Sequence, residues 1–305
     1  MKIGLMAGAT AAAGNSVQDI VEFAKQAEHK GFDAVWLANI FGVDAITTLA
    51  LAGWETSRIE LGTAVTPTFP RHPSAIAQQA LTTAAASDNR FALGIGLSHK
   101  LVIEDMLGMS YDKPAKHMRE YLEILAPLLR GEPAAFAGEQ YTSHVALDIP
   151  GAKKVPLIVA ALGPVMLKLA GEMADGTTTW VTGPKTIGEH IVPIITAAAT
   201  AAGRDAPRIV CGLPIVLTND VEGAKETIGK QLKMYGQLPS YRAMLDREGA
   251  EGPADVALIG DEAAIRSQLQ SLRDAGVTDF NGAVTDVGGG EHTRTIDFLA
   301  SEIPS

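Results

Sequence analysis

Two turns in the sequence have the residue types of an anion-binding site. In Leu162-Gly163-Pro164-Val165-Met166 an apolar run ends at a glycine, and the proline begins a helix without wasting an N–H donor. The free N–H groups and the dipole at such a helix start attract anions. Val181-Thr182-Gly183-Pro184-Lys185 repeats the arrangement one unit later and adds a lysine. An ordinary strand–helix turn without a ligand has the same spacing, but two such turns in neighbouring units favour a phosphate-bearing ligand.

A third glycine-containing segment, Gly94-Ile95-Gly96, ends another apolar run. The third glycine of a dinucleotide-binding turn would stand at position 99, which is His99, and no helix opens directly afterwards. We therefore expect these glycines to allow close backbone approach to a flat ligand.

Metal and nucleophile chemistry are not favoured by the spacing. No two of the seven histidines lie within five residues of each other, and the sequence has neither a His-Glu-x-x-His run nor a pair of cysteines. The Gly-x-Ser-x-Gly elbow of α/β-hydrolases is also absent. We therefore expect no metal site. The single cysteine, Cys211, lies in an apolar run and is expected to be an inert buried thiol.

Eight short apolar runs alternate with segments of helical spacing, and each run is nearly continuously apolar rather than alternating. Strands that are buried on both faces, as in the parallel sheets of α/β proteins, have this character. The predicted strands are Ile3–Ala7, Ala34–Ala38, Ile59–Val65, Phe91–Gly96, Leu157–Ala161, Thr177–Val181, Ile209–Leu217 and Val277–Val284. The predicted helices are one that Ser16 caps and Gly31 ends, and the segments Ala45–Trp54, Pro73–Ala86, Ala115–Leu129, Val165–Ala174, Gly188–Ala202 and Glu222–Tyr235.

Eight strand–helix units in 305 residues predict an α/β fold in which residues 1–305 form a single (β/α)₈ TIM barrel. No linker of Pro, Ser or charged residues divides the chain. A doubly wound sheet is the alternative. Irregular insertions are expected near 97–114, 131–154 and 236–256. The first and third are expected at the catalytic face of the barrel, whereas the second follows a helix and is a candidate surface hairpin.

The net charge and the composition limit the kinds of partner that the protein is expected to bind. The chain carries a net charge of −10 and no run rich in Lys or Arg, which argues against nucleic acid as a partner. Its 47% hydrophobic and 20% charged residues are typical of a soluble globular protein. No segment is long and apolar enough for a signal peptide or a membrane span. We therefore expect a cytoplasmic protein without a membrane partner.

Several of these segments, taken in order, resemble the luciferase-like monooxygenase superfamily, and most of all its branch that uses the deazaflavin coenzyme F420. The resemblance covers about residues 1 to 285. The motifs that carry it are Trp36-Leu37-Ala38-Asn39, Arg58-Ile59-Glu60-Leu61-Gly62-Thr63-Ala64-Val65, Arg71-His72-Pro73, Asn89-Arg90-Phe91-Ala92-Leu93-Gly94-Ile95-Gly96 and Leu169-Ala170-Gly171-Glu172-Met173-Ala174-Asp175-Gly176.

The resemblance implies a barrel that forms homodimers and holds F420 at the C-terminal ends of its strands, for hydride transfer to or from a small organic substrate. It implies a cis peptide between Ala64 and Val65, behind the cofactor ring. The cofactor contacts that it implies are Asn39, Ala64, Val65, Thr66, Gly96, Leu97, Ser98, His99, Leu162, Gly163, Pro164, Val165 and Met166. Val181, Thr182 and Lys185 would face the substrate.

The sequence also departs from that family. The F420-dependent sugar-phosphate dehydrogenases carry a histidine and a glutamate where this chain has Ile40 and Leu97, so an acid–base pair for oxidising an alcohol is missing. Glucose 6-phosphate is therefore not expected as the substrate. A monooxygenase that uses FMN and a non-catalytic flavin- or deazaflavin-binding protein remain alternatives. His99 is the candidate proton donor, with contact to the cofactor or a cap on its loop as the alternative roles.

Further residues on the expected catalytic face have less defined roles. Arg71, His72, Lys100 and Lys185 form a candidate basic rim for the polyglutamate tail of F420, which FMN lacks. Met106, Met109 and Tyr111 are either substrate contacts or a small core within their loop, and Tyr235 and Tyr241 close either the pocket or a dimer contact.

Overall fold

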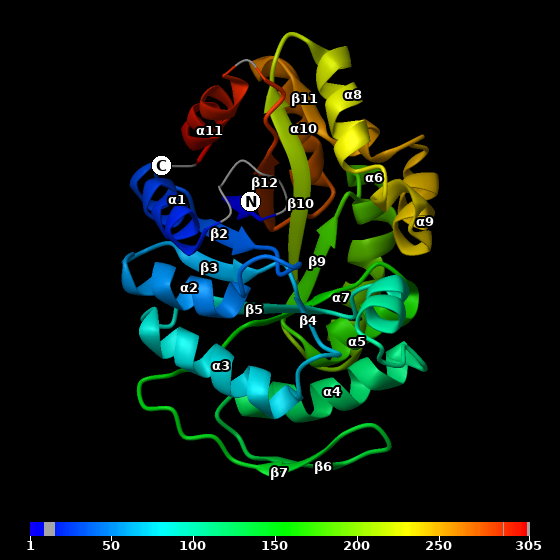
Figure 1. The fold of residues 1–305 in the computed structure, drawn as a ribbon. Coiled ribbons are helices and arrows are strands. Elements are labelled where there is room, and N and C mark those ends of the chain that lie inside the picture. Colours follow the sequence, from blue (N-terminus) through cyan, green and yellow to red (C-terminus); the bar gives the residue numbers. More distant parts are fainter. Residues whose placement is uncertain (9–15, 289, 304–305) are drawn as a thin grey trace.

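The computed structural model describes residues 1–8, 16–288 and 290–303, which form a closed parallel barrel surrounded by helices (Figure 1). Each strand pairs with its neighbours in parallel, and pairings of β10 with both β9 and β12, and of β12 with β1, close the ring. The eight barrel strands are β1 (Lys2–Ala7), β2 (Ala34–Leu37), β3 (Glu60–Thr63), β5 (Phe91–Gly96), β8 (Leu157–Ala160), β9 (Gly176–Trp180), β10 (Arg208–Leu217) and β12 (Asp279–Val284). All eight predicted strands are present, and the (β/α)₈ barrel is confirmed.

The helices that follow the strands pack around the outside of the barrel (Figure 1). They are α1 (Val17–His29), α2 (Ala45–Trp54), α3 (Pro73–Ala86), α4 (Pro114–Leu129), α5 (Pro164–Met173), α7 (Val192–Ala201), α10 (Glu262–Asp274) and α11 (Glu291–Ser301). A short α6 (Pro184–Thr186) and a π-helical turn, η3 (Ile187–Ile191), lead directly into α7. The predicted helices correspond to observed ones, whereas α10 and α11 were not predicted.

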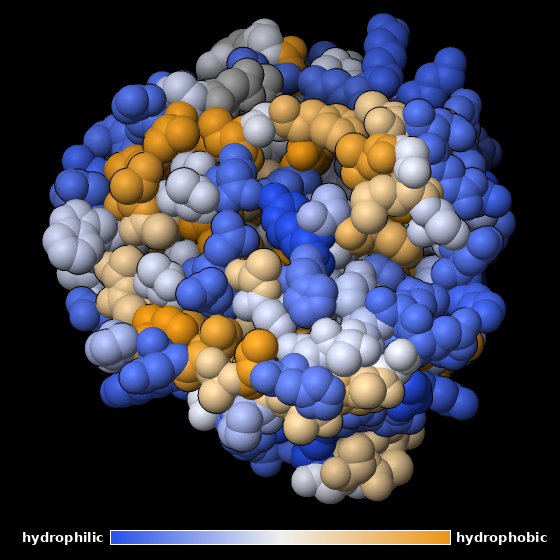
Figure 2. Space-filling view, turned by 60° about the horizontal axis from the view of Figure 1, so that its bottom comes forward, coloured by the Kyte–Doolittle hydropathy of each residue, from blue (hydrophilic) through white to orange (hydrophobic). Residues whose placement is uncertain are grey.

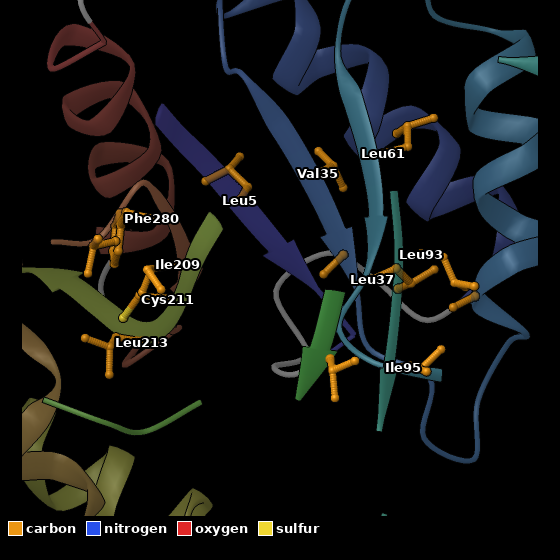
Figure 3. Packing of buried hydrophobic residues seen from close by; sticks show 14 of the residues in the cluster. Leu5, Val35, Leu37, Leu61, Leu93, Ile95, Ile209, Cys211, Leu213 and Phe280 are labelled. Carbon is orange, nitrogen blue, oxygen red and sulfur yellow. The ribbon is translucent and has the colours of Figure 1, made fainter. Parts of the chain in front are cut away.

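Side chains alternate between the outside and the inside of the barrel wall. Outward residues such as Leu5, Leu61 and Leu93 pack in the main core between strands and helices (Figure 3). A separate small cluster contains Trp36, which points to the opposite side of β2 from its neighbours Val35 and Leu37. A Cβ atom on Gly62 would lie 2.5 Å from the Trp36 ring, so only glycine leaves room for the indole inside the barrel.

An ion cluster closes the opposite end of the barrel from the predicted site. Arg208, the first residue of β10, contacts Glu60 of β3 at 2.7 Å and also pairs with Asp279 of β12. Burial alone would lower the pKa of Arg208, but the hydrogen bonds and charges of these two carboxylates outweigh burial and raise it. The guanidinium therefore links β3 to the neighbouring strands β10 and β12 on the opposite side of the ring.

The three predicted insertions contain more regular structure than expected. Residues 97–114 include a π-helical turn, η2 (Leu101–Met106), and residues 131–154 form an antiparallel hairpin of β6 (Ala134–Ala137) and β7 (Thr142–Val145). Residues 236–256 are not irregular. They include the helix α9 (Pro239–Glu248), which begins with a proline and ends at Gly249 in the left-handed region.

Together with α8 (Val221–Gln231) and β11 (Leu258–Gly260), α9 lies between β10 and α10, in a strand-to-helix connection. Cys211 is fully buried, as predicted, and burial raises the pKa of its thiol to about 12. Within the described residues, no helix is long and apolar enough to cross a membrane.

Candidate active site

The C-terminal ends of β3 and β5 fit together closely through glycines. The Ala64–Val65 peptide is cis, as expected from the family resemblance. A Cβ atom on Gly94 would lie 1.8 Å from the carbonyl oxygen of Thr63, and one on Gly96 would lie 2.7 Å from Cγ2 of Val65. The Gly-x-Gly pair is therefore required by the neighbouring strand end, which is a different reason from the flat ligand expected from sequence.

Thr66, the next residue after the cis peptide, carries an unpaired polar group. Thr66 belongs to β4 (Thr66–Pro67), which pairs with β5. Its side chain is fully buried, and its Oγ1 has no hydrogen-bond partner among the described residues. Because an unsatisfied buried hydroxyl is costly, it is a candidate for a ligand contact.

The two predicted anion-binding turns differ in whether a side chain of the protein already occupies the start of the helix. At the start of α5, the N-cap residue Gly163 has an extended backbone and no side chain caps the helix. A Cβ atom on Gly163 would meet nothing within 4 Å, so the space beside this turn is open. Val165, in the first turn, is exposed. This turn keeps the free N–H groups that an anion needs.

The second turn is already occupied by the protein itself. The carboxylate of Glu248, at the end of α9, accepts hydrogen bonds from the N–H groups of Lys185 and Thr186 at 3.2 and 2.7 Å. A Cβ atom on Gly183 would lie 2.3 Å from that carboxyl carbon. The expectation of two ligand-binding anion sites is therefore wrong, because an internal carboxylate fills the one at α6.

The residues expected on the substrate side have different surroundings. Val181 is fully buried in the main core and has a φ of +51°, which is rare for a β-branched residue. Thr182 is buried and donates to the carbonyl of Trp180 at 3.2 Å, whereas Lys185 is exposed. Their contact with a substrate stays a prediction, for which Lys185 is the most accessible of the three.

Asn39 and His99 mark two further strand ends. The side-chain oxygen of Asn39 accepts from the N–H of Ala45 at 2.9 Å, which leaves its amide nitrogen without a partner in the described part of the chain. The ring of His99 lies 5.9 Å from that of Tyr241 on α9. Burial lowers the pKa of His99 and raises that of Tyr241, so both side chains are neutral at pH 7.

Aromatic side chains from the β10–α10 connection meet the end of β9. Tyr235 lies 5.1 Å from Tyr241 and 6.2 Å from Trp180, measured between ring centroids. Both tyrosines are partly buried within this chain. Both roles left open by the sequence, closure of the pocket and a dimer contact, stay predictions.

The predicted basic rim is largely neutralised. Arg71 pairs with Asp44 at 2.8 Å, and Lys100 lies 3.5 Å from Glu104. Nδ1 of His72 accepts from the N–H of Ser74, where it caps α3. Among the described residues Lys185 has no carboxylate within salt-bridge distance, so it is the one rim cation that no carboxylate offsets.

A pocket of about 320 Å³ opens beside the rim, between the starts of α3 and α4 and the tip of the β6–β7 hairpin. Sequence reasoning named Arg71, His72 and Met109 from its lining but missed the residues brought by α4 and the hairpin. Tyr111 stacks on Phe69, which precedes α3, and donates to the carbonyl of Ser98, so its ring packs against a neighbouring loop as well as its own. The residues that line the pocket are Phe69, Pro70, Arg71, His72, Met109, Ser110, His117, Gln140 and Tyr141.

We expect the free energy of unfolding to fall as the pH is lowered from about 6.5 to about 4. His117 stacks on Phe69 at 3.8 Å and contacts the Thr68 hydroxyl, and burial lowers its pKa to about 4. The unfolded chain, in which the histidine pKa is about 6.5, therefore binds an additional proton in this range. Urea denaturation across the range tests this. His117→Phe should show a shallower pH dependence, and an unchanged slope would contradict the assignment.

Comparison with known proteins places these features in a family. The sequence model of the luciferase-like monooxygenase family matches residues 1–280. A 5,10-methylenetetrahydromethanopterin reductase of Methanolobus tindarius is 31% identical, over 86% of this chain and 80% of its own length. An F420-dependent glucose-6-phosphate dehydrogenase of Kineococcus radiotolerans is 30% identical, over 87% and 81%.

A solved structure with the same fold is an F420-dependent secondary alcohol dehydrogenase in complex with an F420–acetone adduct. It aligns with a TM-score of 0.81 over 99% of this chain and 98% of its own, at 20% sequence identity.

Proposed function

Because the chain belongs to the luciferase-like monooxygenase family, we propose that it is an oxidoreductase that transfers hydride between coenzyme F420 and a small organic substrate. Relatives at 30–31% identity include a dehydrogenase named for F420 and a methylenetetrahydromethanopterin reductase, which agrees with the cofactor predicted from the sequence. The observation that carries the proposal is the uncapped, open start of α5 beside the barrel mouth.

The residues present fit this cofactor. F420 has a flat ring system and a phosphate, and the site offers one suitable group for each. Among the described residues, the buried Thr66 hydroxyl has no partner, and it lies beside the cis peptide, where a ring would lie. The N–H groups around Gly163 have no acceptor in the described ranges of the chain and could bind a phosphate. Asn39, with its unused amide nitrogen, is a third contact.

When bound, F420 supplies a two-electron hydride carrier, and the protein provides position and a dry surrounding. Val65 would support one face of the ring, since its side chain packs directly against Gly96. The aromatic group of Trp180, Tyr235 and Tyr241 would exclude water. Burial lowers the pKa of His99 and keeps its ring neutral, so His99 would donate a hydrogen bond to the substrate from its imidazole N–H or accept a proton at its other ring nitrogen.

The proposed substrate is apolar or conjugated. Ile40 and Leu97 stand where the sugar-phosphate dehydrogenases of this family have an acid–base pair, and Ile40 is exposed. A chain with this departure is not proposed to oxidise glucose 6-phosphate, although one relative carries that activity. Oxidation of an alcohol needs a base in the protein to remove the hydroxyl proton. Hydride transfer to a polarised double bond does not need that base.

We also propose a homodimer, as the family resemblance implies. Leu51 and Trp54 of α2 are exposed, Trp54 to 76%, and large exposed apolar groups often mark an interface. On the face drawn in Figure 2, hydrophobic residues form separate clusters with hydrophilic residues between them.

The purified protein is expected to bind F420 several-fold more tightly than FMN. The open phosphate turn serves both cofactors, so the difference should come from the ring contacts and from Lys185 near the anionic tail. Fluorescence titration with each cofactor measures it, and the F420 affinity should fall as salt screens the tail.

Turnover assays with an oxygen electrode, combined with this titration, separate the alternatives. Reduced F420 should pass hydride to an acceptor without consuming oxygen. Tighter binding of FMN, with oxygen uptake when substrate is added, would favour the monooxygenase. Binding of F420 without turnover of any conjugated carbonyl or imine would favour a non-catalytic carrier.

A further inference from the structure

His190 makes one well-defined contact, to the turn that begins α5. It lies on the π-helical turn η3, and its side chain is 8% exposed. Its Nε2 is 2.8 Å from the carbonyl oxygen of Leu162, 28 residues earlier in the chain. Because a carbonyl can only accept, Nε2 carries a proton and donates it in this bond.

This bond fixes the direction of the donors beside it. In a trans peptide the C=O and the following N–H point to opposite sides. With the Leu162 carbonyl held by His190, the N–H of Gly163 must point away from η3. Neither this N–H nor those of Val165 and Met166 donate to any other group in the part of the chain that is described. Pro164 has no N–H, so these three are the donors of the turn.

The backbone around His190 is held in place on both sides. α5 and α7 pack so closely that a Cβ atom on Gly171 would lie 2.5 Å from the carbonyl oxygen of Ile195. η3 leads directly into α7, and π-helical turns of this kind often occur at functional sites. The imidazole is therefore presented to Leu162 from a rigid helix pair, rather than from a mobile loop.

We propose that His190 is a positioning residue for the phosphate of the cofactor. His190 does not touch the phosphate. It holds the Leu162–Gly163 peptide in the orientation that directs the Gly163 N–H toward the phosphate. The proposal rests on the proposed function, because that function supplies the phosphate. It assigns a role to a buried histidine that the hydride-transfer chemistry does not use.

Two variants of similar polarity test this role. The amide nitrogen of a glutamine reaches the place of Nε2, whereas that of an asparagine reaches only the place of Nδ1. We expect His190→Gln to keep the F420 affinity of the wild type within about twofold and His190→Asn to lose roughly tenfold, the scale of one hydrogen bond. Affinity is measured by fluorescence titration of the apoprotein, without turnover.

The second ligand is the deazariboflavin fragment of F420, which lacks the phosphate and the tail. Its affinity should change by less than about twofold in either variant, because the fragment does not reach the turn. The positioning role is wrong, while the proposed function stands, if His190→Asn keeps the wild-type ratio of F420 affinity to fragment affinity. An equal loss of affinity for both ligands is one such outcome. If the wild type itself does not prefer F420 to the fragment, the phosphate placement fails, and the inference fails with it.

Discussion

Replacing Arg208 with methionine is expected to lower the free energy of unfolding by about 3–5 kcal/mol, the range seen when one partner of a buried ion pair is removed. Arg208 contacts Glu60 and Asp279, and the Asp279 side chain is only 5% exposed. Without the guanidinium, two carboxylates face each other across the closed end of the barrel. Urea denaturation at neutral pH measures the loss.

A surface ion pair provides the matched control. The side chains of Arg130 and Glu132 are 38% and 54% exposed, so Arg130→Met should cost less than about 1 kcal/mol. Adding Glu60→Gln and Asp279→Asn to the Arg208 variant should recover much of the loss, because no unpaired charge then remains. A loss below about 1 kcal/mol for Arg208→Met would mean that the cluster contributes no more than a surface pair.

Gly163→Glu is expected to weaken F420 binding roughly 100-fold and to leave the thermal stability almost unchanged. The Gly163 backbone is extended and its side-chain position is open, so any residue can be accommodated. The new carboxylate would compete for the same N–H groups and repel the phosphate. Two like charges about 4 Å apart repel each other by about 1 kcal/mol in bulk water and by about 4 kcal/mol near a protein surface. Fluorescence titration of the folded variant gives the affinity.

Gly163→Gln introduces a side chain of nearly the same size as that of Gly163→Glu but without its charge. It therefore separates the effect of charge repulsion from the effect of side-chain size. It should lose far less affinity than the glutamate variant. Equal losses in both variants would assign the effect to bulk, and wild-type affinity in both would remove this turn from the cofactor site.

The barrel could be predicted because each of its strands is marked by residues that adjoin in the sequence. Each parallel strand is buried on both faces, so a continuous apolar run such as Phe91–Gly96 identifies it without knowledge of its neighbours. The start of α5 was predictable for the same reason, since Gly163 and Pro164 adjoin in sequence. A helix as short as α9 has weak periodicity, and its signals were limited to Pro239 and Gly249.

The surroundings of the site were less predictable because they depend on distant residues. The carboxylate that fills the α6 turn comes from Glu248, 62 residues after Thr186, and no local pattern marks that pairing. The same holds for Tyr141, which reaches the rim pocket only because three N–H groups at the hairpin tip, including its own, donate to Glu120 of α4.

The contact between Glu248 and α6 limits how this scaffold can be re-engineered. Thr186 also donates through its hydroxyl to the carbonyl of Met244, so α9 and α6 are joined by three hydrogen bonds. The segment between β10 and α10 is thus not an exchangeable module. A chimera that receives this segment from another barrel without an acidic residue at the position of Glu248 would leave the N–H groups of Lys185 and Thr186 without this acceptor, and a residue larger than Gly183 would push the Glu248 carboxylate away from them.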